Sequence, residues 1–176
     1  MFENNVELTI GFTGHRPNSL PWKFNESAPS CIAFKKDLYT MLEKAIQNGW
    51  ASFISGLAIG YDTIAAETVL ELKKKYKDVK IYGAIPHPDQ EAKWTDDAKD
   101  RYKKLLKKLD GYVICSDSYD GPETMYKRNQ FIVNNSSVIV ALWNGSPRSG
   151  TANTVNYAKK QGRKVCIINP NNYKND

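Results

Sequence analysis

The stretch SGLAIGYDTIAAE, residues 55–67, decides how this chain folds. The apolar run ASFISG at 51–56 leads into it, and a helical pattern begins at Tyr61. Ser55, Gly56 and Gly60 keep the turn between them small and flexible, and Asp62 places a carboxylate in the first helical turn. A buried strand that passes through such a turn into a helix predicts one half of a βαβ unit.

The same alternation runs through the whole chain. Further short runs are nearly continuous in apolar or β-branched residues, which is typical of strands covered on both faces of a parallel sheet. With 51–56, the predicted strands are VELTIGF at 6–12, KIYGAI at 80–85, GYVICS at 111–116, SSVIVALW at 136–143 and KVCIIN at 164–169.

Helical stripes of apolar residues fill the intervals, at 34–46, 61–76, 125–133 and 151–158. Regular alternation of strand and helix predicts a parallel sheet with right-handed crossovers. We therefore expect an α/β fold, a Rossmann-like doubly wound parallel sheet in three α/β/α layers. Residues 1–170 are expected to form a single domain, and 171–176 a frayed tail.

Composition narrows the class of protein. The chain has 176 residues, 41% of them hydrophobic, and a formal net charge of +6. It shows no secretory signal and no apolar run long enough for a membrane span, so a cytoplasmic protein is expected. Three cysteines without a CxxC spacing and two isolated histidines argue against a disulfide framework or a metal site.

The positive charge favours anionic partners. Much of it lies in LKKKYKDVK at 72–80 and KDRYKKLLKKL at 99–109. These lysines fit solvated outer helix faces, and less readily a track for nucleic acid.

Ligands of such sheets bind outside the carboxyl ends of the strands, where the strand order reverses. Glycine turns there bring backbone N–H groups to the positive end of a helix dipole, which suits phosphate. Three turns qualify, GFTGHRP at 11–17, SGLAIG at 55–60 and NGSPRSGT at 144–151. A GxGxxG fingerprint is absent after the first strand, so we predict no NAD-linked dehydrogenase and no cofactor.

The candidate ligand-binding residues all follow strands or open helices at this edge. They are Gly11, Thr13, Gly14, His15, Arg16, Ser55, Gly56, Leu57, Ala58, Gly60, Asp62, Pro86, His87, Arg128, Asn129, Trp143, Asn144, Gly145, Ser149, Gly150 and Thr151.

Several of these residues have structural alternatives. Arg128 can grip a phosphate with two N–H groups, or it can pair with Asp117 or Asp120. Asn129 can form hydrogen bonds with a base or ribose, or cap a strand. Trp143 can stack on a base or cover the apolar core. Asp62 can bind a ribose hydroxyl or stabilise its helix N-terminus.

SGLAIGYDTIAA at 55–66 and RSGTANTVNYAKKQGRKVCIINP at 148–170 resemble the two signatures of the SLOG superfamily. GFTGHRP and MYKRNQFIVNNSSVIVALWNG at 125–145 resemble its YpsA-like branch. The superfamily includes the DNA-processing protein DprA and the LOG phosphoribohydrolases. The resemblance implies a Rossmann-like fold and a nucleotide or nucleotide-derived ligand at the glycine turns. It does not imply one activity.

The chain departs from the LOG pattern PGGxGTxxE, because Thr154 stands where the catalytic glutamate would be. A hydroxyl cannot serve as that acid or base near neutral pH. Glu67 or Asp62 could substitute as the catalytic carboxylate.

The favoured hypothesis is binding of a nucleotide or ADP-ribose-like signal, as a sensor or a sequestering protein. We expect the protein to form a homo-oligomer. The alternatives are N-glycosidic hydrolysis of a nucleoside 5′-monophosphate and single-stranded DNA binding of the DprA kind.

Overall fold

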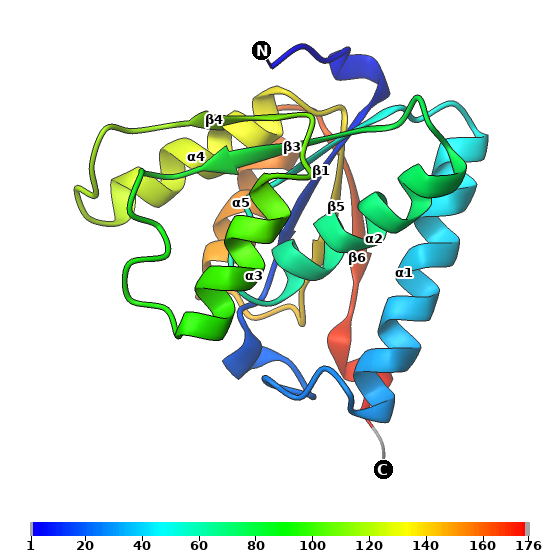
Figure 1. Ribbon diagram of the computed structural model, residues 1–176, viewed down its shortest axis with the longest axis horizontal. Helices are drawn as coiled ribbons and strands as arrows, with labels where there is room; N and C mark the ends of the chain where they lie inside the picture. The colour runs from blue at the N-terminus through cyan, green and yellow to red at the C-terminus, as the bar shows by residue number, and fades with distance from the viewer. Residues whose placement is uncertain (1, 175–176) are drawn as a thin grey trace.

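A single parallel sheet forms the centre of the protein in the computed structural model, which describes residues 2–174 (Figure 1). The sheet has six strands in the order β4-β3-β2-β1-β5-β6. The strands are β1 (Thr9–Gly14), β2 (Ser52–Ser55), β3 (Lys80–Ile85), β4 (Gly111–Ile114), β5 (Val138–Leu142) and β6 (Lys164–Ile168).

Helices cover both faces of this sheet and complete three layers (Figure 1). The α-helices are α1 (Pro29–Gln47), α2 (Tyr61–Lys75), α3 (Asp96–Leu106), α4 (Pro122–Asn134) and α5 (Gly150–Lys160). Short 3-10 helices are η1 (Val6–Leu8), η2 (Pro17–Ser19) and η3 (Pro170–Tyr173). The first three α-helices lie on one face, and α4 and α5 lie on the other. The predicted Rossmann-like α/β/α fold is confirmed.

Two apolar cores explain why the strands are almost continuously apolar. Phe12 and Phe53 belong to the core beneath α1, α2 and α3. Ile54, next to Phe53 in β2, belongs to the opposite core with Ile132 of α4 and Ala158 of α5. Since successive side chains of a strand point to opposite faces, both positions must be apolar when helices cover both faces.

The strand order reverses at β1, which sets the place of the candidate site. From β1 the chain builds β2, β3 and β4 outward on one side, and then crosses to place β5 and β6 on the other. At the carboxyl end, Gly14 of β1 pairs in register with Leu142 of β5. The connections that leave these two strands diverge here and open a crevice between them.

The chain ends differ from the sequence prediction. Val6–Leu8 form η1, and β1 starts at Thr9, where its register with Ser52 of β2 begins. Residues 171–173, assigned to a frayed tail, lie in η3, where the Tyr173 ring packs edge-on against Phe34. Residues 175 and 176 lie outside the described residues.

Within residues 2–174, no helix has the length and apolar character of a membrane span. Over the same residues, no three His, Cys, Asp or Glu side chains gather as a metal ion would need.

Candidate anion-binding site at the strand switch point

A cavity of about 420 Å³ opens at the carboxyl end of β1, between α2, α4 and α5. Its walls come from segments far apart in sequence, because the crossover connections converge at this edge. The lining residues are Phe12, Thr13, Gly14, His15, Arg16, Ser19, Asp62, Met125, Arg128, Asn129, Ser149, Gly150 and Thr151.

Arg128 is the central charge of this cavity. It lies in the second turn of α4 and is only 5% exposed. Its Nη1 donates to the carbonyl of Gly56 at 2.7 Å, and its Nε donates to Oδ1 of Asn129 at 2.8 Å. Nη2 makes no hydrogen bond with the described residues, so this nitrogen is free to donate to a further acceptor. Burial lowers the pKa of Arg128, against the opposing effect of Asp62.

Gly56 makes room for this arginine. A Cβ atom at position 56 would lie 1.9 Å from Nη1 of Arg128 and 2.7 Å from Oδ2 of Asp62. Non-bonded atoms do not come this close to each other. The Gly56 backbone can therefore approach the guanidinium only because the residue has no side chain. Gly56 therefore positions a protein cation at the cavity without lining the cavity itself.

Asp62 is the carboxylate of the cavity. It is 7% exposed in the first turn of α2, with its Oδ2 3.8 Å from Nη1 of Arg128. Burial raises the pKa of Asp62, although the charges of Arg128 and Arg16 oppose this shift. The sequence alternatives for Arg128, pairing with Asp117 or Asp120, are wrong, because its acidic neighbour is Asp62.

The N-terminus of α5 forms the facing wall. Ser149 caps it, its Oγ accepting from the N–H of Ala152 at 3.0 Å, while the N–H of Asn153 donates to the Ser149 carbonyl. The N–H groups of Gly150 and Thr151 have no acceptor within the helix, as at every helix start. A helix start with free N–H groups attracts negative charge.

His15 and Asn144 join β1 to the end of β5 beside the cavity. Nε2 of His15 lies 2.8 Å from Oδ1 of Asn144, and this oxygen also accepts from the N–H of Ser146 at 3.0 Å. The backbone N–H of Asn144 also lies 3.2 Å from Nε2 of His15 and donates to it. Asn144 therefore holds the imidazole ring through Nε2 with both its side chain and its backbone.

Ten of the predicted ligand-binding residues line the cavity, and eleven do not. The ten are Thr13, Gly14, His15, Arg16, Asp62, Arg128, Asn129, Ser149, Gly150 and Thr151. Outside it lie Gly11, Ser55, Gly56, Leu57, Ala58, Gly60, Pro86, His87, Trp143, Asn144 and Gly145.

Packing accounts for several of the residues outside the cavity. A Cβ atom at Gly11 would lie 2.6 Å from the Ile132 side chain, so this glycine lets α4 pack on β1. Ser55 donates its hydroxyl to the carbonyl of Asp62 at 2.7 Å and supports the turn from behind. The indole N–H of Trp143 donates to the carbonyl of Ser146 at 3.0 Å, and the His87 ring packs on Tyr119.

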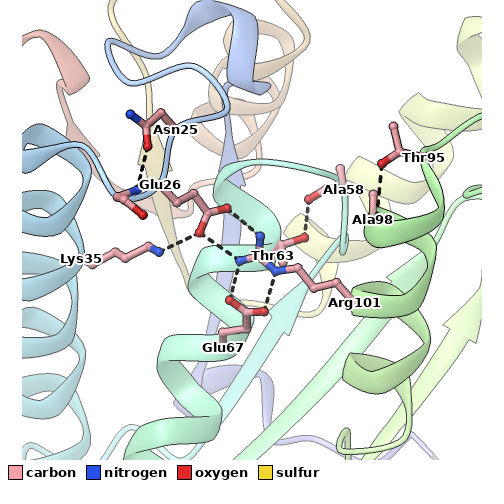
Figure 2. A network of polar contacts seen from close by, with 10 residues as sticks. Asn25, Glu26, Lys35, Ala58, Thr63, Glu67, Thr95, Ala98 and Arg101 are labelled. Carbon is pink, nitrogen blue, oxygen red and sulfur yellow. Dashed lines mark hydrogen bonds and ion pairs between the residues drawn. The ribbon is translucent and has the colours of Figure 1, made fainter.

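Glu67, the other candidate for a catalytic carboxylate, lies outside the cavity and is bound by an arginine. Its two oxygens accept from Nε and Nη2 of Arg101 at 2.8 and 2.6 Å (Figure 2). The same guanidinium binds both oxygens of Glu26, which also accepts from Lys35 at 2.6 Å. Glu67 therefore belongs to an ion-pair network between α2, α3 and the segment before α1, and does not line the cavity.

Thr154, which replaces the LOG glutamate, is buried and donates its hydroxyl to the carbonyl of Gly150 at 3.0 Å. Its side chain is used inside α5. Among the described residues, Asp62 is therefore the one carboxylate that lines this cavity.

Sequence reasoning missed Phe12, Ser19 and Met125, which also line the cavity. Ser19 lies in η2, shortly after the glycine turn at the end of β1, and Met125 precedes Arg128 by one helical turn. The position of Met125 on the face of Arg128 follows from the helical period, which could have identified it.

The fold and this cavity define a Rossmann-like α/β protein with a basic pocket at the strand switch point. Residues 10–173 match the YspA SLOG family, and the chain belongs to that family. It is 33% identical over 156 residues to the SPbeta prophage-derived protein YoqJ of Bacillus subtilis, and the matched region covers 81% of this chain and 91% of YoqJ. It is 29% identical over 154 residues to a UPF0398 protein of Bacillus cereus, and the matched region covers 87% of this chain and 83% of that protein.

Solved structures of DNA processing protein A share the fold. The chain superposes on the protein from Streptococcus pneumoniae with a TM-score of 0.60 and 21% identity, covering 92% of this chain and 50% of DprA. The Helicobacter pylori protein was described for its single-stranded DNA binding mode. The chain superposes on it with a TM-score of 0.64 and 17% identity, covering 93% of this chain and 66% of that protein. The chain thus spans half to two thirds of these proteins.

Proposed function

We propose that this protein binds a nucleotide or nucleotide-derived ligand, such as an ADP-ribose-like molecule, in the cavity at the switch point. The observation that supports the proposal is the buried guanidinium of Arg128, which lines the cavity and whose Nη2 has no hydrogen-bond partner among the described residues. A buried charge without a full set of partners is costly. An anionic ligand would supply the missing acceptor.

The charges around the cavity suit a phosphate group. Arg16 and Arg128 contribute two positive charges and Asp62 one negative charge, and the start of α5 adds free N–H groups. Arginine binds phosphate oxygens through paired N–H groups. Asp62 would repel phosphate, so we assign it to a hydroxyl of the ligand, such as that of a ribose.

Binding is better supported than catalysis. N-glycosidic hydrolysis needs a carboxylate beside the bond that breaks. Glu67 is held by Arg101 outside the cavity, and Asp62, the one described carboxylate in its lining, lies 3.8 Å from the Arg128 guanidinium and has no second carboxylate beside it to complete an acid–base pair. We therefore favour a cytoplasmic sensor or sequestering protein over a phosphoribohydrolase.

Calorimetry with AMP, ADP, ADP-ribose and ribose 5-phosphate tests the proposal. Arg16→Ala removes an exposed cation of the cavity and should weaken binding about tenfold. Lys36→Ala, an exposed cation of α1, is the matched control and should bind like the wild type. Equal affinities of the wild type and Arg16→Ala for every ligand would contradict the proposal. Chromatography of the same mixtures reports free base if hydrolysis occurs.

The likeness to DprA favours single-stranded DNA as a second candidate ligand. Part of the basic surface is already neutralised, since Lys73, Lys74 and Lys75 pair with Asp110, Glu71 and Glu43. DNA binding predicts an affinity that falls steeply with salt, because each phosphate contact releases a counterion. A mobility-shift series with an oligonucleotide at rising salt distinguishes it from a mononucleotide ligand.

A further inference from the structure

A second hollow, about 350 Å³ in volume, lies between α4 and α5. It is lined by Tyr126, Asn129, Gln130, Asn153, Thr154 and Tyr157. Asn129 lines both this hollow and the switch-point cavity. On α5, Gly150 and Thr151 line the cavity, and Asn153 and Thr154 line the hollow directly after them. The two spaces therefore lie next to each other along the helix pair, and we call the second one the α4–α5 groove.

Two tyrosines give this groove aromatic surface. Tyr157 is fixed, because its hydroxyl donates to Oδ1 of Asn134 at 3.0 Å and its ring packs on the core beneath α4 and α5. Tyr126 is 39% exposed, and its hydroxyl makes one long contact of 3.5 Å with Nδ2 of Asn153. An exposed tyrosine ring is a surface on which a nucleobase can stack.

The amide of Asn129 has a fixed orientation at the junction. Its Oδ1 accepts from Nε of Arg128 at 2.8 Å. Because Nε–H can only donate, the amide oxygen must face Arg128, and the NH₂ group is left for a ligand. Asn129 thus offers donors to an acceptor atom at the point where cavity and groove meet.

We propose that the α4–α5 groove is the base subsite for a ligand whose phosphate lies at the start of α5. This inference rests on the proposed function and adds that the ligand carries a planar heteroaromatic base joined to a phosphorylated sugar. With a helical rise of 1.5 Å per residue, Thr154 and Tyr157 lie about 6 and about 10 Å along α5 from Gly150. That separation matches the span of a mononucleotide from phosphate to base.

Another aromatic hollow competes for this role. It has a volume of about 380 Å³ and is lined in part by Trp22, Phe24 and Trp94. It shares no lining residue with the switch-point cavity. Between them the chain is closely packed, since a Cβ atom at Gly60 would lie 3.0 Å from Cδ of Pro17 and 3.1 Å from the His15 carbonyl. A ligand held at α5 therefore reaches the α4–α5 groove more directly.

The experiment compares nucleoside 5′-monophosphates with ribose 5-phosphate by calorimetry, using Tyr126→Ala, Tyr126→Phe and Phe24→Ala. Loss of a stacking surface weakens nucleic-acid base binding by about fivefold to a hundredfold. Tyr126→Ala should therefore bind the mononucleotides at least about fivefold more weakly and ribose 5-phosphate unchanged. Tyr126→Phe keeps the ring and should retain binding. Phe24→Ala truncates an aromatic residue of the other hollow that is more exposed than Tyr126, and this variant should bind like the wild type.

The outcomes separate the two proposals. Mononucleotide binding that is unchanged in Tyr126→Ala and weakened by Arg16→Ala would overturn the base subsite and leave the anion site standing. Weakening by Phe24→Ala instead would place the base in the other hollow. No binding of any of these ligands by wild-type protein would overturn both. Unchanged thermal unfolding of Tyr126→Ala verifies that the variant is folded.

Discussion

The turn after β2 combines an absent side chain with an unusual backbone. Gly56 leaves the space that the Arg128 guanidinium occupies. The next residue, Leu57, has a φ of 55°, in the left-handed region that non-glycine residues rarely adopt. Leu57 is fully buried, and its N–H donates to the Ser55 hydroxyl at 3.2 Å. Burial of the leucine side chain stabilises a backbone that would otherwise cost of order 1–2 kcal/mol.

Gly56→Ala tests this arrangement. The new methyl group would collide with Arg128, and overpacking of this kind costs about 1–3 kcal/mol. We expect the free energy of unfolding in urea to fall by about that amount and ligand binding to be lost with the displaced guanidinium. Gly150→Ala is the matched control for stability, because nothing lies within 4 Å of its Cβ position. Equal stability of the two variants would contradict the packing argument.

Asp62 gives the cavity a pH dependence of known sign. Burial raises its pKa in the folded state. The folded protein then binds more protons than the unfolded chain at a pH above the ordinary aspartate value of about 4, and its stability falls as the pH rises through this window. The slope is at most about 1.4 kcal/mol per pH unit.

Asp62→Asn removes this titration. We expect the variant's free energy of unfolding, relative to wild type, to increase as the pH rises from about 4. Urea unfolding of both proteins across that range provides the measurement. A relative stability that is constant with pH, or that falls, would show that Asp62 is fully ionised in the fold.

At the scale of elements, one arginine ties three segments together. Arg101 of α3 holds Glu67 of α2 and Glu26, which precedes α1 (Figure 2). Its hydrogen bonds with Glu67 raise the pKa of Arg101 despite partial burial. Burial alone would raise the pKa of Glu26, but Arg101 and Lys35 outweigh it, and the net shift is downward. This network orders the helices on the face of the sheet opposite α4 and α5.

Glu67→Gln separates a structural from a catalytic role. Since the ion pair is partly exposed, we expect unfolding to become easier by about 1 kcal/mol or less, with nucleotide affinity unchanged. Glu71→Gln, which removes a more exposed pair with Lys74, should change stability still less. Thermal unfolding and calorimetry measure the two properties. If Glu67→Gln lost ligand binding and Glu71→Gln did not, Glu67 would have to act at the ligand site.

At the scale of the whole molecule, the cavity lies where the two halves of the sheet meet. Its lining comes from β1, α2, α4 and α5. Helices from both faces therefore contribute to one site, and a bound ligand would link them. Opening either half of the molecule would then require release of the ligand.

We therefore expect ligand to stabilise the entire fold. For a ligand that binds only the folded state, a concentration 100 times Kd adds about 2.7 kcal/mol to the free energy of unfolding. Denaturant unfolding with and without the ligand found by calorimetry measures this gain. Arg16→Ala should reduce the gain at the same ligand concentration. A ligand that binds in calorimetry without any stabilisation would contradict a site formed by the folded core.

Much of this architecture could be predicted from sequence. The apolar strands, the helical stripes and the glycine turns identified the parallel sheet, its helices and the edge where the turns gather. Local patterns did not predict that residues 6–8 form η1 instead of the start of β1, or that residues 171–173 lie in η3. Tyr173 is held by Phe34, far away in sequence, and a local pattern contains no such contact.

The amino-acid sequence by itself determined the class of fold and the edge that carries the site, because strand and helix periodicities are local properties of the chain. Tertiary structure decided which charges meet there. It brought Arg128 of α4 against Gly56 and Asp62, and it bound Glu67 to Arg101 outside the cavity. The physical reason is that the partner of a charged side chain is chosen by packing across crossover connections, over separations of 72 and 34 residues that no periodicity encodes.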